Sequence, residues 1–146
     1  RWRMENAYGP ETDDLLLTAH AQYFAVSNLF ELNADDSCTA FSTANIALSP
    51  SGAGASAFDD IAVGSGTSDF SLNSPLVAGA SQNFSFSAPL AGNADTIDIG
   101  VDLSAFPWLR FDWNGDGSLD DHPNVSATFG QYRGHDRIIY WRELSN

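Results

Sequence analysis

The sequence contains no lysine, and six arginines stand against nineteen aspartates and glutamates, for a formal net charge of −13. A surface this acidic repels phosphates, so nucleic acid is excluded as a partner. Docking on an anionic lipid surface is disfavoured for the same reason. No apolar run approaches the length of a membrane span, which excludes direct membrane insertion. The composition instead favours a soluble domain in a salty or extracellular setting.

Cysteine is equally scarce. The single Cys38 cannot form a disulfide within the chain. Two alternatives remain open: in an exported protein Cys38 pairs with a cysteine outside this chain, or it is a small buried thiol. No histidine or arginine flanks it in the sequence, so nothing indicates a catalytic nucleophile.

An initiator methionine and a signal peptide are also absent before Arg1. We therefore expect one domain, residues 1–146, from the C-terminal end of a larger exported protein. With 43% hydrophobic and 12% aromatic residues, a chain of this length is sufficient for a hydrophobic core.

Polar and apolar residues alternate along much of the chain, which predicts half-buried β-strands. Connectors rich in Gly, Pro, Ser and Asn separate these runs. The pattern predicts an all-β fold, an antiparallel β-sandwich of jelly-roll or Ig-like type with roughly nine or ten strands. Residues 49–81 are the least regular and are compatible with small strands, a long loop or a packed linker. The clearest predicted strands are 2–8, 15–25, 27–32, 82–87, 96–103 and 136–142.

An acidic loop at residues 112–121 places oxygen-bearing side chains at alternate positions and glycines between them. Ca²⁺ prefers six to eight oxygen ligands, so this spacing predicts a calcium site. The twelfth position, where an EF-hand has a bidentate Glu, is Pro123, so we expect no EF-hand helices and expect Asp121 or a remote acid to complete the site. The alternative is a metal-free acidic turn. The predicted ligands are Asp112, Asn114, Asp116, Ser118, Asp120 and Asp121.

Two tryptophans, Trp108 and Trp113, bracket this loop and are the best candidates for a sugar-binding face. Packing in the core or against the loop is the alternative for both rings. No catalytic residue is predicted, because the adjacent acid pairs would point to opposite faces of a strand and the histidines lack metal-ligand spacing. The acid pairs are Asp13–Asp14, Asp35–Asp36 and Asp59–Asp60, and the histidines are His20, His122 and His135.

Several segments together resemble the C-terminal domain of MshQ-like proteins, which are encoded with the mannose-sensitive haemagglutinin type IV pilus. The resemblance runs from near Arg1 to Glu143 and is weakest across residues 49–81. It rests on residues 6–11, 35–39, 102–109, the acidic loop and 127–143.

The resemblance implies an exported, pilus-associated surface protein. We expect a non-enzymatic, calcium-stabilised binding or assembly domain on the cell surface, with pilin subunits or another surface protein as its partner. The alternative is a carbohydrate-binding, lectin-like module whose partner is a cell-surface glycan. A glycoside hydrolase is the least favoured reading, because it needs two carboxylates facing each other across a cleft.

Overall fold

The computed structural model describes residues 1–26, 28–50, 58–81 and 84–130. Within these residues the fold is all-β, with two short 3₁₀ helices, η1 (Thr43–Asn45) and η2 (Pro107–Leu109). The strands are β1 (Trp2–Met4), β2 (Ala7–Gly9), β3 (Leu15–Leu16), β4 (Ala19–Phe24), β5 (Phe30–Leu32), β6 (Ile46–Ser49), β7 (Ile61–Val63), β8 (Gly66–Ser68), β9 (Phe70–Leu72), β10 (Phe84–Phe86), β11 (Thr96–Val101) and β12 (Asn124–Phe129).

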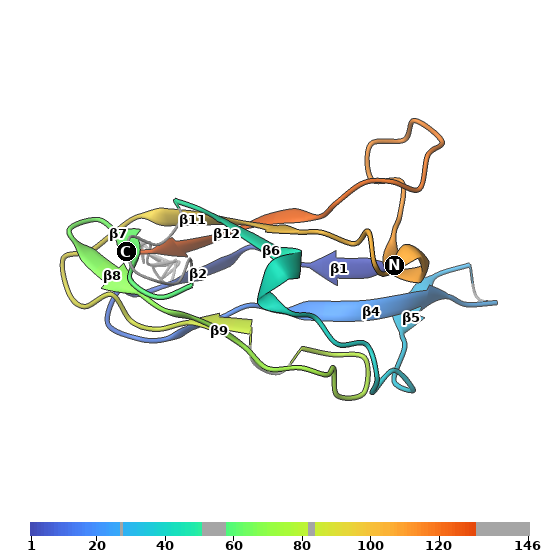
Figure 1. Cartoon of the computed structure of the whole chain (residues 1–146), viewed down its shortest axis with the longest axis horizontal. Coiled ribbons are helices and arrows are strands. Elements are labelled where there is room, and N and C mark those ends of the chain that lie inside the picture. Colours follow the sequence, from blue (N-terminus) through green and yellow to red (C-terminus); the bar gives the residue numbers. More distant parts are fainter. Residues whose placement is uncertain (27, 51–57, 82–83, 131–146) are drawn as a thin grey trace, which may run out of the picture.

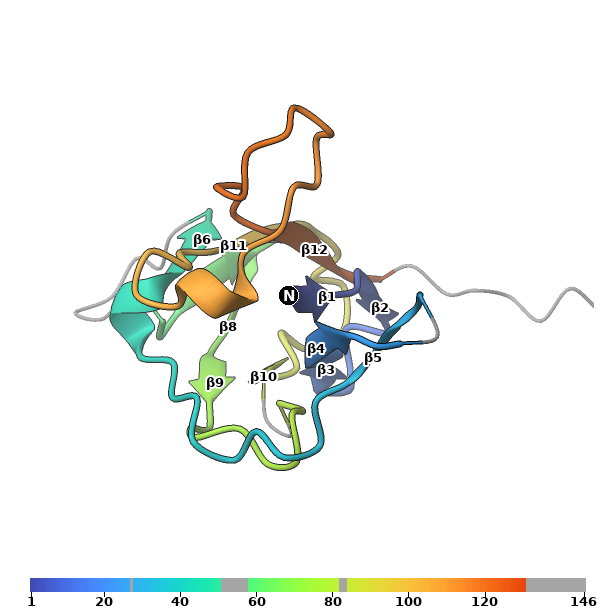
Figure 2. The same ribbon diagram turned by 90° about the vertical axis from the view of Figure 1, so that its right-hand side faces the viewer.

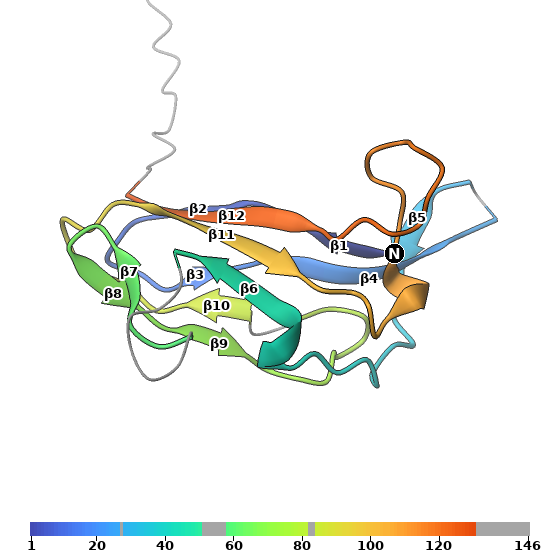
Figure 3. The same ribbon diagram turned by 45° about the horizontal axis from the view of Figure 1, so that its top comes forward.

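The strands form four small sheets in a sandwich-like arrangement around one core (Figures 1 and 3). Their orders are β2-β12-β11-β6, β3-β10-β9, β1-β4-β5 and β7-β8. Pairing is antiparallel throughout these sheets except between β12 and β2, which run parallel. Seen along its long axis, the body encloses the core, and the connecting loops gather at the ends (Figure 2).

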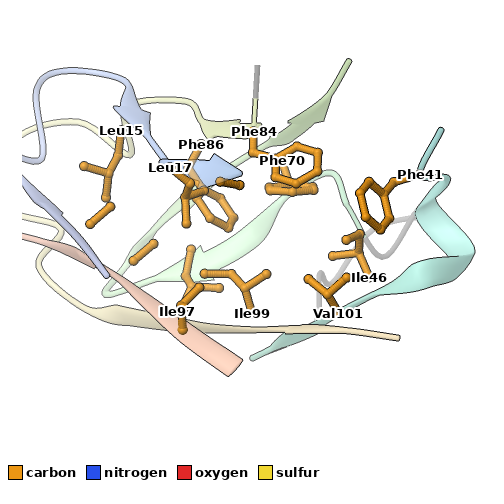
Figure 4. Packing of buried hydrophobic residues seen from close by; sticks show 14 of the residues in the cluster. Leu15, Leu17, Phe41, Ile46, Phe70, Phe84, Phe86, Ile97, Ile99 and Val101 are labelled. Carbon is orange, nitrogen blue, oxygen red and sulfur yellow. The ribbon is translucent and has the colours of Figure 1, made fainter. Parts of the chain in front are cut away.

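The core lies between β11 on one side and β9 and β10 on the other (Figure 4). Along β11, Ile97, Ile99 and Val101 are buried while Thr96 and Asp98 are exposed, as the alternation predicted. Opposite them, the rings of β9 and β10 pack against one another. This aromatic and branched seam holds the two layers together.

The predicted strand over residues 15–25 is divided in two. Leu15, Leu17, Ala19 and Ala21 are all buried, so the alternation is continuous. The hydrogen-bonding partner changes along it, because β3 pairs with β10 whereas β4 pairs with β1. Side-chain periodicity cannot reveal such a change of partner.

Within the predicted strand 2–8, Trp2 is fully buried, whereas Tyr8 has an exposed fraction of 47%. The chain leaves β1 after Met4 and enters a different sheet as β2. The break shifts the alternation by one residue, so that Ala7 faces the core in place of Tyr8.

Part of the irregular middle segment forms small strands, β7, β8 and β9, in agreement with one of the three alternatives. The predicted strand at 136–142 lies outside the described residues. Among the described residues, no helix is long and apolar enough to cross a membrane.

Asp36 fastens the connection between β5 and η1. Its carboxylate is buried and accepts hydrogen bonds from the backbone N–H of Thr39 at 2.9 Å, the Thr39 hydroxyl at 2.7 Å and the Cys38 N–H at 3.3 Å. Burial alone would raise the pKa of Asp36, but the hydrogen bonds from Thr39 and Cys38 outweigh burial and hold that pKa below 3.8.

We predict that Asp36→Asn destabilises the domain at neutral pH by about 1–3 kcal/mol, because it removes charge-assisted hydrogen bonds. A depressed folded-state pKa contributes stability above the unfolded-state pKa and loses it as the pH falls through the folded-state pKa. Urea unfolding from neutral to acidic pH should therefore show the difference between wild type and variant shrinking below about pH 4. The control is Asp35→Asn, at the exposed neighbouring residue. A difference that stays constant down to acidic pH would contradict this role.

Candidate binding site at the acidic-loop end

The acidic loop projects from the body at the end that also carries the N-terminus, η2 and the β4–β5 hairpin (Figures 1 and 2). An isolated antiparallel bridge between Phe111 and Asp121 closes its base. The loop leaves η2 and returns into β12, so both of its ends are fixed by the body of the domain. The loop is therefore anchored to the body of the domain at both of its ends.

Asp112 organises the first half of the loop. Its Oδ1 accepts hydrogen bonds from the N–H groups of Gly115 at 2.6 Å and Asp116 at 3.1 Å, and its Oδ2 accepts one from Gly117 at 2.8 Å. Gly115 and Gly117 have φ values of +78° and +89°, a backbone region that favours glycine. The glycines let the backbone wrap around one carboxylate.

Asn114 lies between two further carboxylates. Its Nδ2 is 3.1 Å from Oδ2 of Asp116 and 3.1 Å from Oδ1 of Asp121. Asp121 also accepts the N–H groups of Trp113 and Asn114 through Oδ2. The carboxylates of Asp116 and Asp121 therefore converge on one position inside the loop.

The backbone N–H of Ser118 and the amide of Asn114 lower the pKa of Asp116 below its ordinary value. Ser118 contributes its N–H to the network, and Asp120 is exposed. Across the described part of the chain, no group of three or more His, Cys, Asp or Glu side chains is arranged so that it could hold a metal ion. The structure thus brings Asp112, Asn114, Asp116 and Asp121 into one hydrogen-bonded network and leaves Asp120 outside it.

An aromatic cluster joins this loop to the β4–β5 hairpin. The guanidinium carbon of Arg1 lies 3.6 Å from the ring centre of Phe30 and 4.9 Å from those of Phe111 and Trp113. Phe111 also packs edge-on against Phe30, at 5.1 Å between ring centres, and against Trp113 at 5.0 Å. Such cation–π and edge-to-face contacts fix the loop relative to the hairpin.

A groove of about 530 Å³ runs between the hairpin and the segment 108–111. One wall comes from β4 and β5, the other from η2 and the start of the acidic loop, and Arg1 contacts both walls. Its lining contains two arginines and, within the described residues, no acid. The lining residues are Arg1, Gln22, Tyr23, Phe24, Phe30, Asn33, Trp108, Leu109, Arg110, Phe111 and Leu119.

The two candidate tryptophans do not share one surface. Trp108 is 61% exposed and lines the groove, with its ring edge-on to Phe106 at 5.7 Å. Trp113 lines a separate cavity of about 350 Å³ with Met4, His122 and other residues. The sequence placed both rings beside the loop but could not show that they line different cavities.

The acid pairs lie outside the strands, in turns, bends and irregular segments. Two of these acids accept backbone N–H groups: Asp14 from Ala88 at 2.9 Å, and Asp36 from Thr39. Asp14 therefore links two segments that are distant in the chain, whereas Asp36 stabilises its own segment. The prediction that Asp13–Asp14, Asp35–Asp36 and Asp59–Asp60 point to opposite faces of strands was wrong in its premise, because Asp and Asn favour turns.

His122 closes the base of the acidic loop, and Cys38 is exposed. The Nδ1 of His122 accepts the N–H of Leu103 at 3.0 Å and lies 3.6 Å from Oδ1 of Asp102. Cys38 is a free thiol on the surface, so the alternative of a buried thiol is wrong. His20 is on β4, and His135 lies outside the described residues.

Sequence reasoning missed Arg1, Arg110 and the aromatic residues of the hairpin as parts of this site. Arg1 and Arg110 are far apart in the sequence and in no motif, and Tyr23 and Phe24 were assigned to an ordinary strand. The one available signal was the rarity of arginine in so acidic a chain. Only the fold brings these segments to one groove.

Comparison with known families gives one match. The family model described as DUF6701, fourth domain, matches residues 1–144, almost the entire chain. No curated protein and no solved structure matches it significantly. The family description names no pilus component, so it neither supports nor opposes the resemblance to MshQ-like proteins.

We predict that Glu31 controls the ionisation of Tyr23 at the rim of the groove. The Tyr23 hydroxyl donates to Oε2 of Glu31 at 3.2 Å, and the charge and hydrogen bond of Glu31 raise the pKa of Tyr23 above 10. Glu31→Gln should lower that pKa, and Asp35→Asn should lower it less, because Asp35 acts only through weaker charge repulsion. Titration of the Tyr23 ring signals by NMR measures both effects. Equal shifts in the two variants would contradict the assignment.

Proposed function

This chain belongs to the DUF6701 fourth-domain family, and we propose that it is a calcium-stabilised, extracellular binding domain without catalytic activity. Its partner contacts the acidic-loop end. The observation that carries the proposal is the construction of that end, where a groove with exposed aromatic side chains is held open by packed rings and Arg1. Exposed apolar side chains gathered around one groove are typical of a binding surface.

Calcium suits the donor chemistry of the loop, because every candidate ligand offers oxygen. The carboxylates of Asp116 and Asp121 both accept a hydrogen bond from the side-chain nitrogen of Asn114, which carries only a partial positive charge. A cation at such a focus would offset the repulsion among the four aspartates of the loop more effectively than an amide does. The residues that would hold it are Asp112, Asn114, Asp116, Ser118 through its carbonyl, Asp120 and Asp121.

Binding an ion would require the loop to tighten, because its carboxylates now share their oxygens with backbone N–H groups. A carboxylate has about four acceptor positions, so these hydrogen bonds leave room for a metal contact. The cost of rearrangement favours an affinity in the range of extracellular modules, roughly 10⁻⁴ to 10⁻³ M. That range is sufficient where calcium is millimolar.

A non-enzymatic role is supported by how the acidic side chains are used. Asp14 accepts the backbone N–H of Ala88 and Asp69 accepts that of Asp60, while Asp36 accepts the N–H of Thr39 within its own segment. Asp112 and Asp121 do the same inside the loop. Carboxylates engaged in this way stabilise turns and loops, and part of their capacity to accept protons or hydrogen bonds is already used by the backbone.

The cellular setting of the proposal rests on the resemblance to MshQ-like proteins. On that basis the domain belongs to an exported, type IV pilus-associated surface protein and takes part in adhesion or in docking to pilin subunits or another surface protein. The acidic surface is consistent with an extracellular site. The alternative function, a carbohydrate-binding module, is favoured by one observation: the largely exposed ring of Trp108 in the groove.

We predict that millimolar Ca²⁺ raises the Tm of the domain and that excess EDTA reverses the effect. At calcium concentrations about one to ten times the proposed Kd, the ion adds about 0.4–1.4 kcal/mol of stability. For a domain of this size that corresponds to roughly 1–6 °C. Asp116→Ala should abolish the calcium-dependent shift, whereas Asp13→Ala, an exposed acid outside the loop, should retain it. Identical melting curves in calcium and EDTA would exclude a structural calcium site.

A second prediction concerns the partner. Tagged domain mixed with purified pilin subunits should retain them in calcium and release them in EDTA, because the loop supports one wall of the groove. Trp108→Ala should weaken retention of the pilin subunits. Leu90→Ala, at an exposed apolar residue that does not line the groove, should leave retention unchanged. Retention that survives Trp108→Ala unchanged would place the contact elsewhere on the domain.

A further inference from the structure

We infer that the groove between the β4–β5 hairpin and residues 108–111 binds a sugar that carries a carboxylate, such as the end of an acidic glycan. This inference rests on the carbohydrate-binding alternative of the proposed function, because it takes the groove at the acidic-loop end as a sugar site and not as a contact with pilin subunits. It adds the chemical class of the ligand, which neither the family nor the calcium loop specifies.

Two guanidinium groups line the groove with hydrogen-bonding capacity in reserve. Arg1 donates from Nε to Gln22 at 2.9 Å, and its two terminal nitrogens have no side-chain or backbone acceptor among the described residues. Arg110 donates from Nε to the Leu103 carbonyl and from Nη2 to the Ser104 carbonyl, both at 3.2 Å, which leaves Nη1 in reserve. Guanidinium groups held in place by such contacts are well suited to a carboxylate.

The lining of the groove contains two arginines and no acid, whereas Glu31 and Asp35 act on Tyr23 at its rim and Asp102 interacts electrostatically with Arg110. Among the described arginines, Arg3 forms an ion pair with Glu5 at 2.9 Å, whereas Arg1 and Arg110 have no carboxylate within 4.0 Å in the described structure. The nearby Glu31 accepts a hydrogen bond from the Tyr23 hydroxyl. In a chain of net charge −13, a groove lined by two arginines and no acid is complementary to an anion.

The rest of the lining suits a sugar ring. Trp108, 61% exposed, lines the groove as well as a neighbouring cavity and packs edge-on against Phe106, and Phe24 on the opposite wall is also 61% exposed. Flat aromatic faces pack against the C–H faces of sugars, while the side-chain amides of Gln22 and Asn33 can bond to hydroxyls. A volume of about 530 Å³ lies within the range of small-ligand sites.

A single carboxylate on a sugar fits better than three competing ligands. A neutral sugar would leave the terminal N–H groups of Arg1 and Arg110 without a charged acceptor. A highly charged polyanion would be repelled by the acidic surface around the groove. An acidic peptide would satisfy the arginines, but its side chains would not require the broad exposed rings of Trp108 and Phe24.

The test is isothermal titration calorimetry of the 146-residue chain in millimolar Ca²⁺ with matched probes. Sialyllactose is compared with lactose, and methyl galacturonoside is compared with methyl galactoside, so that each acidic probe carries one carboxylate. At least one acidic probe should bind, with its neutral counterpart weaker by about tenfold or more. Binding of neither acidic probe, or equal binding of the acidic and neutral members of each pair, would overturn the inference.

Variants locate the binding and separate it from folding. Arg110→Gln and Trp108→Ala should each lower the affinity for the acidic probe by about tenfold or more. Arg3→Gln, at an arginine paired with Glu5, should leave that affinity unchanged. The Tm of each variant is first shown to equal that of the wild type. If Arg110→Gln has a lower Tm, the binding measurement on Trp108→Ala is used in its place. Stronger binding of a glutamate-rich peptide than of the acidic sugars would also overturn the inference. A calcium-dependent Tm shift without sugar binding would refute the ligand class alone and leave the proposed function standing.

Discussion

The structure depends on one seam of apolar side chains, where Ile97, Ile99 and Val101 of β11 meet the rings of β9 and β10. Burial of these groups is what compensates for ordering so many short strands, because strands of two or three residues have little stability alone. With the seam fixed, the polar connections are forced to the ends of the sandwich-like body. The functional part of the domain is built from those end connections.

At the acidic-loop end, local polar order and aromatic packing are coupled. Carboxylates inside the loop satisfy its own backbone, so the loop has a defined shape without apolar contacts of its own. Phe111 and Trp113 at its base then engage Arg1 and the hairpin ring of Phe30. A change in the loop, such as ion binding, is therefore positioned to affect the groove through Phe111. This coupling links the calcium proposal to the binding proposal.

Electrostatics in this chain work at two scales. The net charge of −13 keeps polyanions away over distances comparable with the Debye length. The groove, in contrast, is lined by Arg1 and Arg110 and by no acid among the described residues. A surface whose net charge repels nucleic acid can therefore still contain a site for a small anion. The composition gives the net charge, but only the positions of individual side chains show which charges line the groove.

The sequence by itself determined the all-β class, the inward face of β11 and the position of the acidic loop, because all three follow from local periodicity and spacing. It did not determine that residues 15–25 change partner or that Tyr8 faces outward, since pairing is a long-range property. The groove was decided by tertiary structure alone. Its walls come from the hairpin, η2 and Arg1, which are distant in the chain and meet only when the core closes.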